Sequence, residues 1–253
     1  MRSRTIAILM AGMFACGAAS AQVLVYRLTG VVQALTDPAG LLGAPAAGTS
    51  FELDYRADFS LGMFSGATGG LGSTNYLMGG TSYPPDSGPP SLLVSPVSAV
   101  LRVGGHELAF AGDYDGHVQY TQSYIGTLFG GYAESWADYG AAGRSGGVTS
   151  EVTTSLYSQY SATVFGLIDT LGAVVVDGDA VSGTASFSWA DGTTTVSGTL
   201  LPVSLAVDPV PEPAQWLLLG LGLAALRLRR ALSSAPDTPP GRRPRTPAQC
   251  PTA

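Results

Sequence analysis

One pentapeptide of the chain has the pattern of a catalytic nucleophile. Gly143-Arg144-Ser145-Gly146-Gly147 matches the Gly-x-Ser-x-Gly turn on which α/β-hydrolases present a serine between a strand and a helix. Here the pentapeptide lies in a glycine-rich segment that leads into a predicted strand. Both histidines, His106 and His117, precede Ser145, whereas that enzyme class places its histidine last. We therefore interpret the match as coincidental and assign no catalytic residue.

The densest polar cluster is Asp113-Tyr114-Asp115-Gly116-His117, with Glu107 nearby across a predicted turn. Asp113 and Asp115 are the candidate metal ligands, because Ca²⁺ prefers about six to eight oxygen ligands. The full spacing of an EF-hand loop is missing, so a turn is the favoured interpretation. Asp177-Gly178-Asp179 is a similar pattern. No cofactor is predicted.

A site that binds or cleaves sugars is harder to identify from the sequence than a nucleophile motif or a metal-binding loop. The two carboxylates of a glycoside hydrolase converge from distant strands and have no fixed spacing, so the sequence neither nominates nor excludes such a pair. Aromatic residues in predicted loops could stack on sugar rings, although packing within the loops is the favoured role. These residues are Tyr76, Tyr83, Tyr132, Trp136 and Tyr139.

Charge is unevenly distributed along the chain. Residues 22–208 contain 16 acidic residues against four arginines, Arg27, Arg56, Arg102 and Arg144, and the chain has no lysine. Such a body cannot neutralise many phosphates, so nucleic acid is excluded as a partner, whereas cations and neutral glycans remain open. Both cysteines, Cys16 and Cys250, lie outside this body, which therefore has no internal disulfide and no thiol chemistry.

The body, residues 22–207, has the pattern of an all-β domain. Apolar residues occupy every second position of 51–59, as in a strand with one buried face. Gly104-Gly105 separates two strand-like runs and predicts a hairpin, and 190–192 predicts a second one. Other predicted strands begin with Val23–Leu28 and continue at 118–124, 151–164, 173–176 and 200–207. The glycine-rich segments 61–90 and 130–147 are predicted to be surface loops.

No stretch of the body has extended helical spacing of apolar residues. Strands about ten residues apart with glycine turns are typical of an antiparallel β-sandwich or jelly-roll. The sequence therefore predicts that fold class for the body.

Both ends have the pattern of processing segments. Residues 1–21 combine Arg2 and Arg4 with an apolar run, and Ala19-Ser20-Ala21 fits the small residues that signal peptidase requires before its cut. A signal peptide cleaved after Ala21 is predicted, with an uncleaved membrane anchor as the alternative.

At the other end, residues 208–213 form a linker with the motif Val210-Pro211-Glu212-Pro213. The two prolines keep the backbone around Glu212 extended and accessible. Residues 214–230 then predict one short transmembrane helix whose basic end remains cytoplasmic by the positive-inside rule. The stop-transfer residues are Arg227, Arg229 and Arg230. Residues 231–253 are predicted to be a disordered tail.

This order of motif, apolar span and arginines resembles the C-terminal sorting domain of PEP-CTERM proteins of Gram-negative bacteria that make exopolysaccharide. The resemblance covers residues 209–230. It implies recognition of Pro211, Glu212 and Pro213 by exosortase, a membrane-embedded cysteine protease that cuts near the motif. It therefore implies an inner membrane-anchored precursor and a product at the cell surface or outside the cell.

Three functions remain open at this point. The favoured one is a non-enzymatic surface or matrix protein associated with exopolysaccharide, with signal peptidase and exosortase as processing partners. The alternatives are a secreted hydrolase that acts on polysaccharide and an adhesion module stabilised by Ca²⁺.

Overall fold

The computed structural model describes residues 23–86, 88–125, 132–159, 161, 164–165, 172–176, 178–210 and 227 of the 253-residue chain. Within them the chain forms twelve strands and one short 3-10 turn, η1 (Pro90–Leu93). The strands are β1 (Val23–Thr36), β2 (Ser50–Asp58), β3 (Met63–Gly69), β4 (Gly72–Gly79), β5 (Val97–Val103), β6 (His106–Phe110), β7 (Asp115–Ile125), β8 (Tyr132–Ser145), β9 (Val148–Ser158), β10 (Gly172–Val175), β11 (Val181–Ala190) and β12 (Thr195–Pro209).

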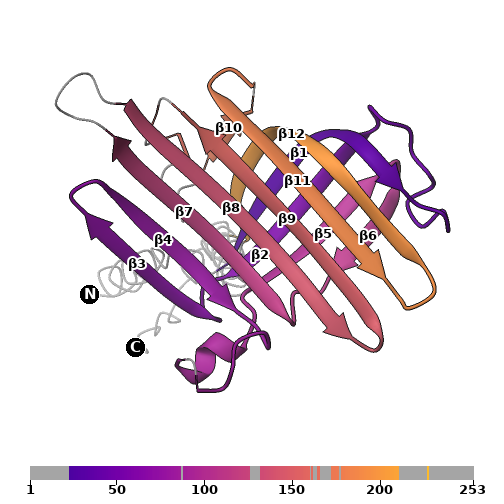
Figure 1. Cartoon of the computed structure of the whole chain (residues 1–253), viewed down its shortest axis with the longest axis horizontal. Helices are drawn as coiled ribbons and strands as arrows, with labels where there is room; N and C mark the ends of the chain where they lie inside the picture. The colour runs from indigo at the N-terminus through magenta and orange to yellow at the C-terminus, as the bar shows by residue number, and fades with distance from the viewer. Residues whose placement is uncertain are drawn as a thin grey trace, which may run out of the picture. The chain divides into compact units, whose positions relative to one another are not determined.

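All twelve strands belong to one antiparallel sheet with the order β3-β4-β7-β8-β9-β11-β12-β1-β2-β5-β6, and β10 pairs with the far half of β12. The sheet curls over, so that β2, β5 and β6 pack against β7, β8 and β9 (Figure 1). The prediction of an all-β antiparallel body is therefore confirmed, with two layers that are parts of one continuous sheet.

Alternation of apolar and polar residues explains why these segments are strands. In β2 the side chains of Phe51, Leu53 and Tyr55 are buried, while Glu52 and Asp54 lie on the outer face. The predicted hairpin β5–β6 is present, and its turn residues Gly104 and Gly105 have φ values of 56° and 87°, which favour glycine. The hairpin β11–β12 is present as well.

The prediction of surface loops at 61–90 and 130–147 was wrong over much of both segments. Residues 63–69 and 72–79 form the hairpin β3–β4, and 132–145 form β8, which pairs along its length with β7 and β9. The glycine content lowers the strand propensity of β8, but Ala137, Tyr139 and Ala141 alternate inward and are buried. Burial between two partner strands therefore overrides local propensity. The strand predicted at 151–164 ends earlier, at Ser158.

β1 and β12 join the two layers. They pair along almost their whole lengths, with register shifts between Thr29 and Gly30 and between Val32 and Ala34. A Cβ at Gly30 would lie 2.7 Å from the ring of Phe51 and closer still to the carbonyl oxygen of Leu201, so only glycine fits there. Bulges of this kind bend a strand, which allows the sheet to fold over its own core.

Tyrosines form the centre of that core. The ring of Tyr139 lies 5.1 Å from the ring of Tyr26 and 5.5 Å from that of Tyr55. The hydroxyl groups of Tyr120 and Tyr139 are hydrogen-bonded at 2.6 Å, and Tyr55 Oη is hydrogen-bonded to Thr154 Oγ1 at 2.9 Å. All of these rings are buried. The Tyr55–Thr154 bond joins the two layers, whereas the Tyr120–Tyr139 bond joins the neighbouring strands β7 and β8 within one layer.

Burial raises the pKa of the Tyr55, Tyr120 and Tyr139 hydroxyls above the ordinary value of 10.0. Above pH 10 these tyrosines lose their protons more readily in the unfolded chain than in the folded one, so the free energy of unfolding should fall as the pH rises. We expect the ionisation of these tyrosines, followed by ultraviolet absorbance, to coincide with loss of the strand signal in circular dichroism. Complete tyrosine ionisation in a chain that is still folded would contradict the buried core.

Candidate functional site

The outward face of β7, β8, β9, β11 and β12 carries polar residues in register. One row across the strands is formed by residues that are directly opposite one another, namely His117, Gly140, Thr153, Ser186 and Thr199. The next row is Gln119, Asp138, Ser155 and Thr184. Five adjacent strands therefore present hydroxyl, amide, imidazole and carboxylate groups side by side.

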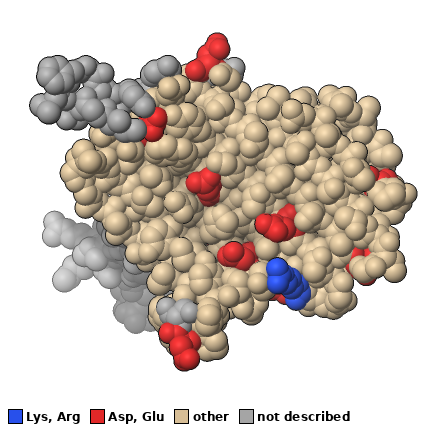
Figure 2. Space-filling view, viewed as in Figure 1, with Lys and Arg blue, Asp and Glu red and all other residues tan. Residues whose placement is uncertain are grey.

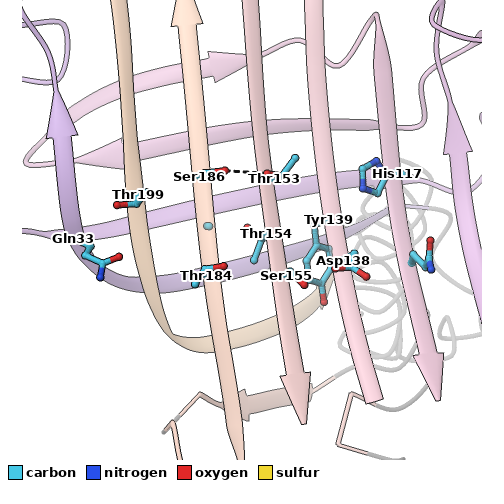
Figure 3. Close-up of a pocket in the computed structure, with 12 residues that line it drawn as sticks. Gln33, His117, Asp138, Tyr139, Thr153, Thr154, Ser155, Thr184, Ser186 and Thr199 are labelled. Carbon is cyan, nitrogen blue, oxygen red and sulfur yellow. Dashed lines mark hydrogen bonds between the residues drawn. The ribbon is translucent and has the colours of Figure 1, made fainter. Parts of the chain in front are cut away.

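These rows line a depression with a volume of about 550 Å³ (Figure 3). We call it the polar trough and define it by its outward residues, Gln33, His117, Gln119, Asp138, Thr153, Ser155, Thr184, Ser186 and Thr199. Its volume is within the range of about 300–1,000 Å³ that is typical of ligand pockets. Gln33 comes from β1, at the register shift between Val32 and Ala34, so a bulge contributes one end of the trough.

The tyrosine core supports the floor of the trough. Tyr139, Thr154 and Ala185 also border it, but they are buried, and they alternate with outward residues of the same strands. The bonds from Tyr120 to Tyr139 and from Tyr55 to Thr154 hold the undersides of β8 and β9. The backbone below the trough is therefore fixed by packing between the two layers.

The position of the His117 ring depends on Gly140, the residue opposite it on β8. A Cβ at Gly140 would lie 2.7 Å from Nδ1 and 2.9 Å from Nε2 of His117. The imidazole therefore occupies the space above the β8 backbone that a side chain at position 140 would need. In this position the His117 ring lines the trough, as Asp138 and Thr153 do (Figure 3).

Most hydrogen-bonding groups of the trough are available to a ligand. Thr153 Oγ1 and Ser186 Oγ are 3.2 Å apart, and Gln119 Nε2 donates to Thr121 Oγ1 at 3.3 Å. By contrast, no side-chain hydrogen bond or ion pair links Asp138 or His117 to any other described residue. Among the residues of the lining that the structure describes, Asp138 is the only acidic one and none is an arginine.

An aromatic pair lies beside the trough. Trp136 precedes Asp138 by two residues and so shares its face of β8, and its ring centroid is 5.4 Å from that of Tyr157 on β9. Tyr157 Oη donates a hydrogen bond of 2.6 Å to Glu134 Oε1. Glu134 is only 7% exposed, so this bond satisfies a carboxylate that packing has largely removed from water.

The face that contains the trough is mostly uncharged, with scattered acidic residues and one arginine near its lower edge (Figure 2). The guanidinium of Arg144, at the end of β8, lies 3.6 Å above the ring of Tyr114. On the other layer, Arg27 pairs with Asp54 at 2.8 Å, and Arg102 pairs with Glu52 and Asp54 at 2.8 and 2.9 Å. Two of the four arginines of the body are thus engaged with acidic residues away from the trough.

Asp113 and Asp115, the weak candidates for metal ligands, lie in the bend before β7 and at its first residue. Asp113 Oδ1 accepts a hydrogen bond from the Arg144 amide at 3.0 Å, and Asp115 begins β7 with its Oδ1 atom buried and without a hydrogen-bond partner. Among the described residues, no group of three or more His, Cys, Asp and Glu side chains is positioned to hold a metal ion. Neither Asp113 nor Asp115 lines the polar trough.

The other residues considered in the sequence are distributed over the body. Ser145 ends β8 and is followed by a turn into β9. His106 lies on edge strand β6, whereas His117 is in the trough. Of the aromatic residues assigned to loops, Tyr139 is fully buried and Trp136 is half-buried beside the trough. The backbone of Tyr132 belongs to β8, Tyr76 is a half-buried residue of β4, and Tyr83 is half-buried after it.

The processing segments lie almost entirely outside the described residues. This applies to Ala19, Ala21, Pro211, Glu212, Pro213, Arg229 and Arg230. Arg227 is described and exposed. Among the residues whose structure is described, we find no helix with the length and apolar character needed to span a membrane.

The sequence did not identify most of the trough. The clearest sign of the trough in the sequence is the alternation of small uncharged polar residues with other residues. Examples are Thr153, Ser155, Ser182, Thr184 and Ser186. Alternation of this kind indicates a strand with one solvent-exposed face, but it does not show which strands are adjacent in the sheet. Asp138 in particular lay in a segment that was predicted to be a loop.

Comparison with known proteins gives one match. The model of the PEP-CTERM protein-sorting motif matches residues 209–231, which include the Pro-Glu-Pro sequence, the apolar run and the arginines. No curated protein and no solved structure matches the chain.

The chain is thus an all-β protein with a C-terminal sorting signal. More specifically, residues 209–231 carry the PEP-CTERM protein-sorting motif, which indicates an exported protein that is sorted by exosortase. The resemblance in the sequence is confirmed by this match.

The Tyr157–Glu134 bond can be tested by one substitution. Tyr157→Phe removes the hydroxyl that donates to a buried carboxylate, and we expect the free energy of unfolding to fall by about 1–3 kcal/mol, measured by urea denaturation. Tyr124→Phe is the matched control, because that ring is 44% exposed. Equal stability of both variants and the parent protein would contradict the role given to this bond.

Proposed function

We propose that this protein is a non-catalytic component of the extracellular matrix that associates with exopolysaccharide through its β-body. The observation that carries the proposal is the combination of an exosortase sorting motif at 209–231 with a broad, largely uncharged polar face on the body. Sorting delivers the protein to the outside of the cell. The polar trough then offers it a surface for hydrogen bonds with a carbohydrate.

The chemistry of the trough supports binding rather than turnover. Hydrolysis of a glycosidic bond ordinarily uses two carboxyl groups about 5–10 Å apart, one on each side of the scissile bond. Asp138 is the only carboxylate among the described residues that line the trough. His117, hydroxyl groups and amides make up the rest of its outward polar surface, and these groups can bind sugar hydroxyls without cleaving the chain.

The route to the outside is part of the same proposal. Signal peptidase removes residues 1–21 after Ala21, and residues 214–230 hold the precursor in the inner membrane until exosortase cuts near Pro211-Glu212-Pro213. The charge order supports this route, since Arg227, Arg229 and Arg230 follow the apolar run directly. In the sequence, the acidic residues 22–208 precede that run.

Replacement of Pro211, Glu212 and Pro213 by alanine in the native host tests the route. We expect a larger, membrane-bound form to accumulate, because exosortase no longer recognises the tail, and western blotting of membrane and medium fractions measures it. The matched control is the triple alanine variant at Pro236, Asp237 and Pro239, which changes two prolines and one acid outside the matched motif. Unchanged release of the first variant would be evidence against processing by exosortase.

Association with the matrix needs a separate measurement. The processed protein, purified from the host, should sediment with exopolysaccharide isolated from the same host and release no reducing sugar during the incubation. The matched comparison is the same protein with the polysaccharide omitted. If nothing is retained, the association is wrong, and if reducing ends appear, the non-catalytic role is wrong.

A further inference from the structure

We propose that the polar trough is a binding site for uncharged polysaccharide, in which Asp138 and His117 bind sugar hydroxyls and the Trp136–Tyr157 pair flanks the chain. This inference rests on the proposed function and assigns it to particular residues. The trough crosses β7, β8, β9, β11 and β12 and ends at Gln33 of β1. At about 4.8 Å between strands, these six strands span about 24 Å, which suits an extended ligand.

The chemistry of the lining suits hydroxyl groups. A carboxylate accepts hydrogen bonds at two oxygens, and a serine or threonine hydroxyl both donates and accepts. Adjacent hydroxyls of a sugar ring can therefore donate to Asp138 while others bond to Ser155 and Thr184 in the same row. No side-chain hydrogen bond or ion pair joins Asp138, Ser155 or Thr184 to a described residue, so a ligand would not have to break one.

Charge decides which class of polysaccharide fits. The described part of the lining holds one carboxylate and no arginine, and Arg27 and Arg102 are paired with acidic residues on the other layer. Residues 22–208 carry 16 acidic residues and four arginines, so a polyanion approaching the body is repelled. The trough therefore favours a neutral chain over one that bears uronate, sulfate or pyruvate groups.

The aromatic pair adds apolar contact to these polar groups. Trp136 lies one outward position along β8 from Asp138, and Tyr157 lies one outward position along β9 from Ser155. The two rings are 5.4 Å apart and tilted by 37°, and the bond of Tyr157 to Glu134 holds one of them in place. Carbon-bound hydrogens of a sugar ring can pack against such rings while its hydroxyls reach the trough.

The test is affinity electrophoresis of the processed protein, purified from the host, in gels containing one polysaccharide each. Dextran, galactomannan and mixed-linkage β-glucan are the neutral probes, alginate is the anionic probe, and chitosan is the cationic probe. We expect retardation by at least one neutral polysaccharide and none by alginate. We also expect little change between low salt and about 0.5 M salt, because a neutral ligand is not held by charge.

Two substitutions locate the binding. Asp138→Asn keeps the size of the side chain and should raise the dissociation constant for the neutral polysaccharide about tenfold, by weakening charge-assisted hydrogen bonds. Trp136→Ala should raise it as well, and both variants should keep the parent's circular dichroism spectrum. Controls are Asp86→Asn, on a surface turn, and Tyr124→Ala, whose ring is exposed on the other face of β7, and both should bind as the parent does.

The outcomes separate this inference from the proposed function. If the parent protein and Asp138→Asn bind equally, or if alginate or only chitosan retards the protein, the trough assignment is overturned. Sedimentation with the host's own exopolysaccharide would in those cases still support the proposed function. If neither the defined polysaccharides nor the host's polysaccharide is bound, both fail. Neutral binding that Asp138→Asn weakens and Asp86→Asn does not supports the assignment.

Discussion

The strict two-residue alternation of β8 and β9 is the constraint on which the rest of the body depends. In β8 the side chain of Tyr139 faces the core and that of Asp138 faces the trough. In the neighbouring strand β9, Thr154 faces the core and Ser155 faces the trough. A slip of one residue in either strand would exchange the two faces. The register is fixed from inside, because the Tyr120–Tyr139 and Tyr55–Thr154 hydrogen bonds join buried groups that have no access to water.

The curl of the sheet separates two kinds of surface. β1 and β12 bend at their bulges, so that one layer carries the arginine–carboxylate pairs of Arg27 and Arg102 and the other carries the polar trough. The layer that carries the trough has only scattered charged residues on the face shown in Figure 2. The C-terminal motif indicates export, and we propose that this face of the exported protein binds neutral, hydroxyl-rich partners.

The sequence predicted the class of the fold and the sorting signal, but not the candidate site. Alternation in β2 and the glycine turn at Gly104-Gly105 act over a few residues, so the local sequence was sufficient. The sorting motif is likewise contiguous at 209–231. The trough depends on which strands are adjacent, and β8 was mistaken for a loop because its glycines and alanines have low strand propensity. Its strand structure comes from pairing with β7 and β9 and from the burial of Tyr139, which are not visible in a local window.

The most direct test of the central claim is the intact mass of the protein recovered from the extracellular polysaccharide of its native host. The account predicts a single species that begins near Gln22, ends close to Pro211–Pro213 and lacks the arginines from Arg227 onward. Recovery of the complete 253-residue chain from the cell interior, with none in the polysaccharide fraction, would contradict it.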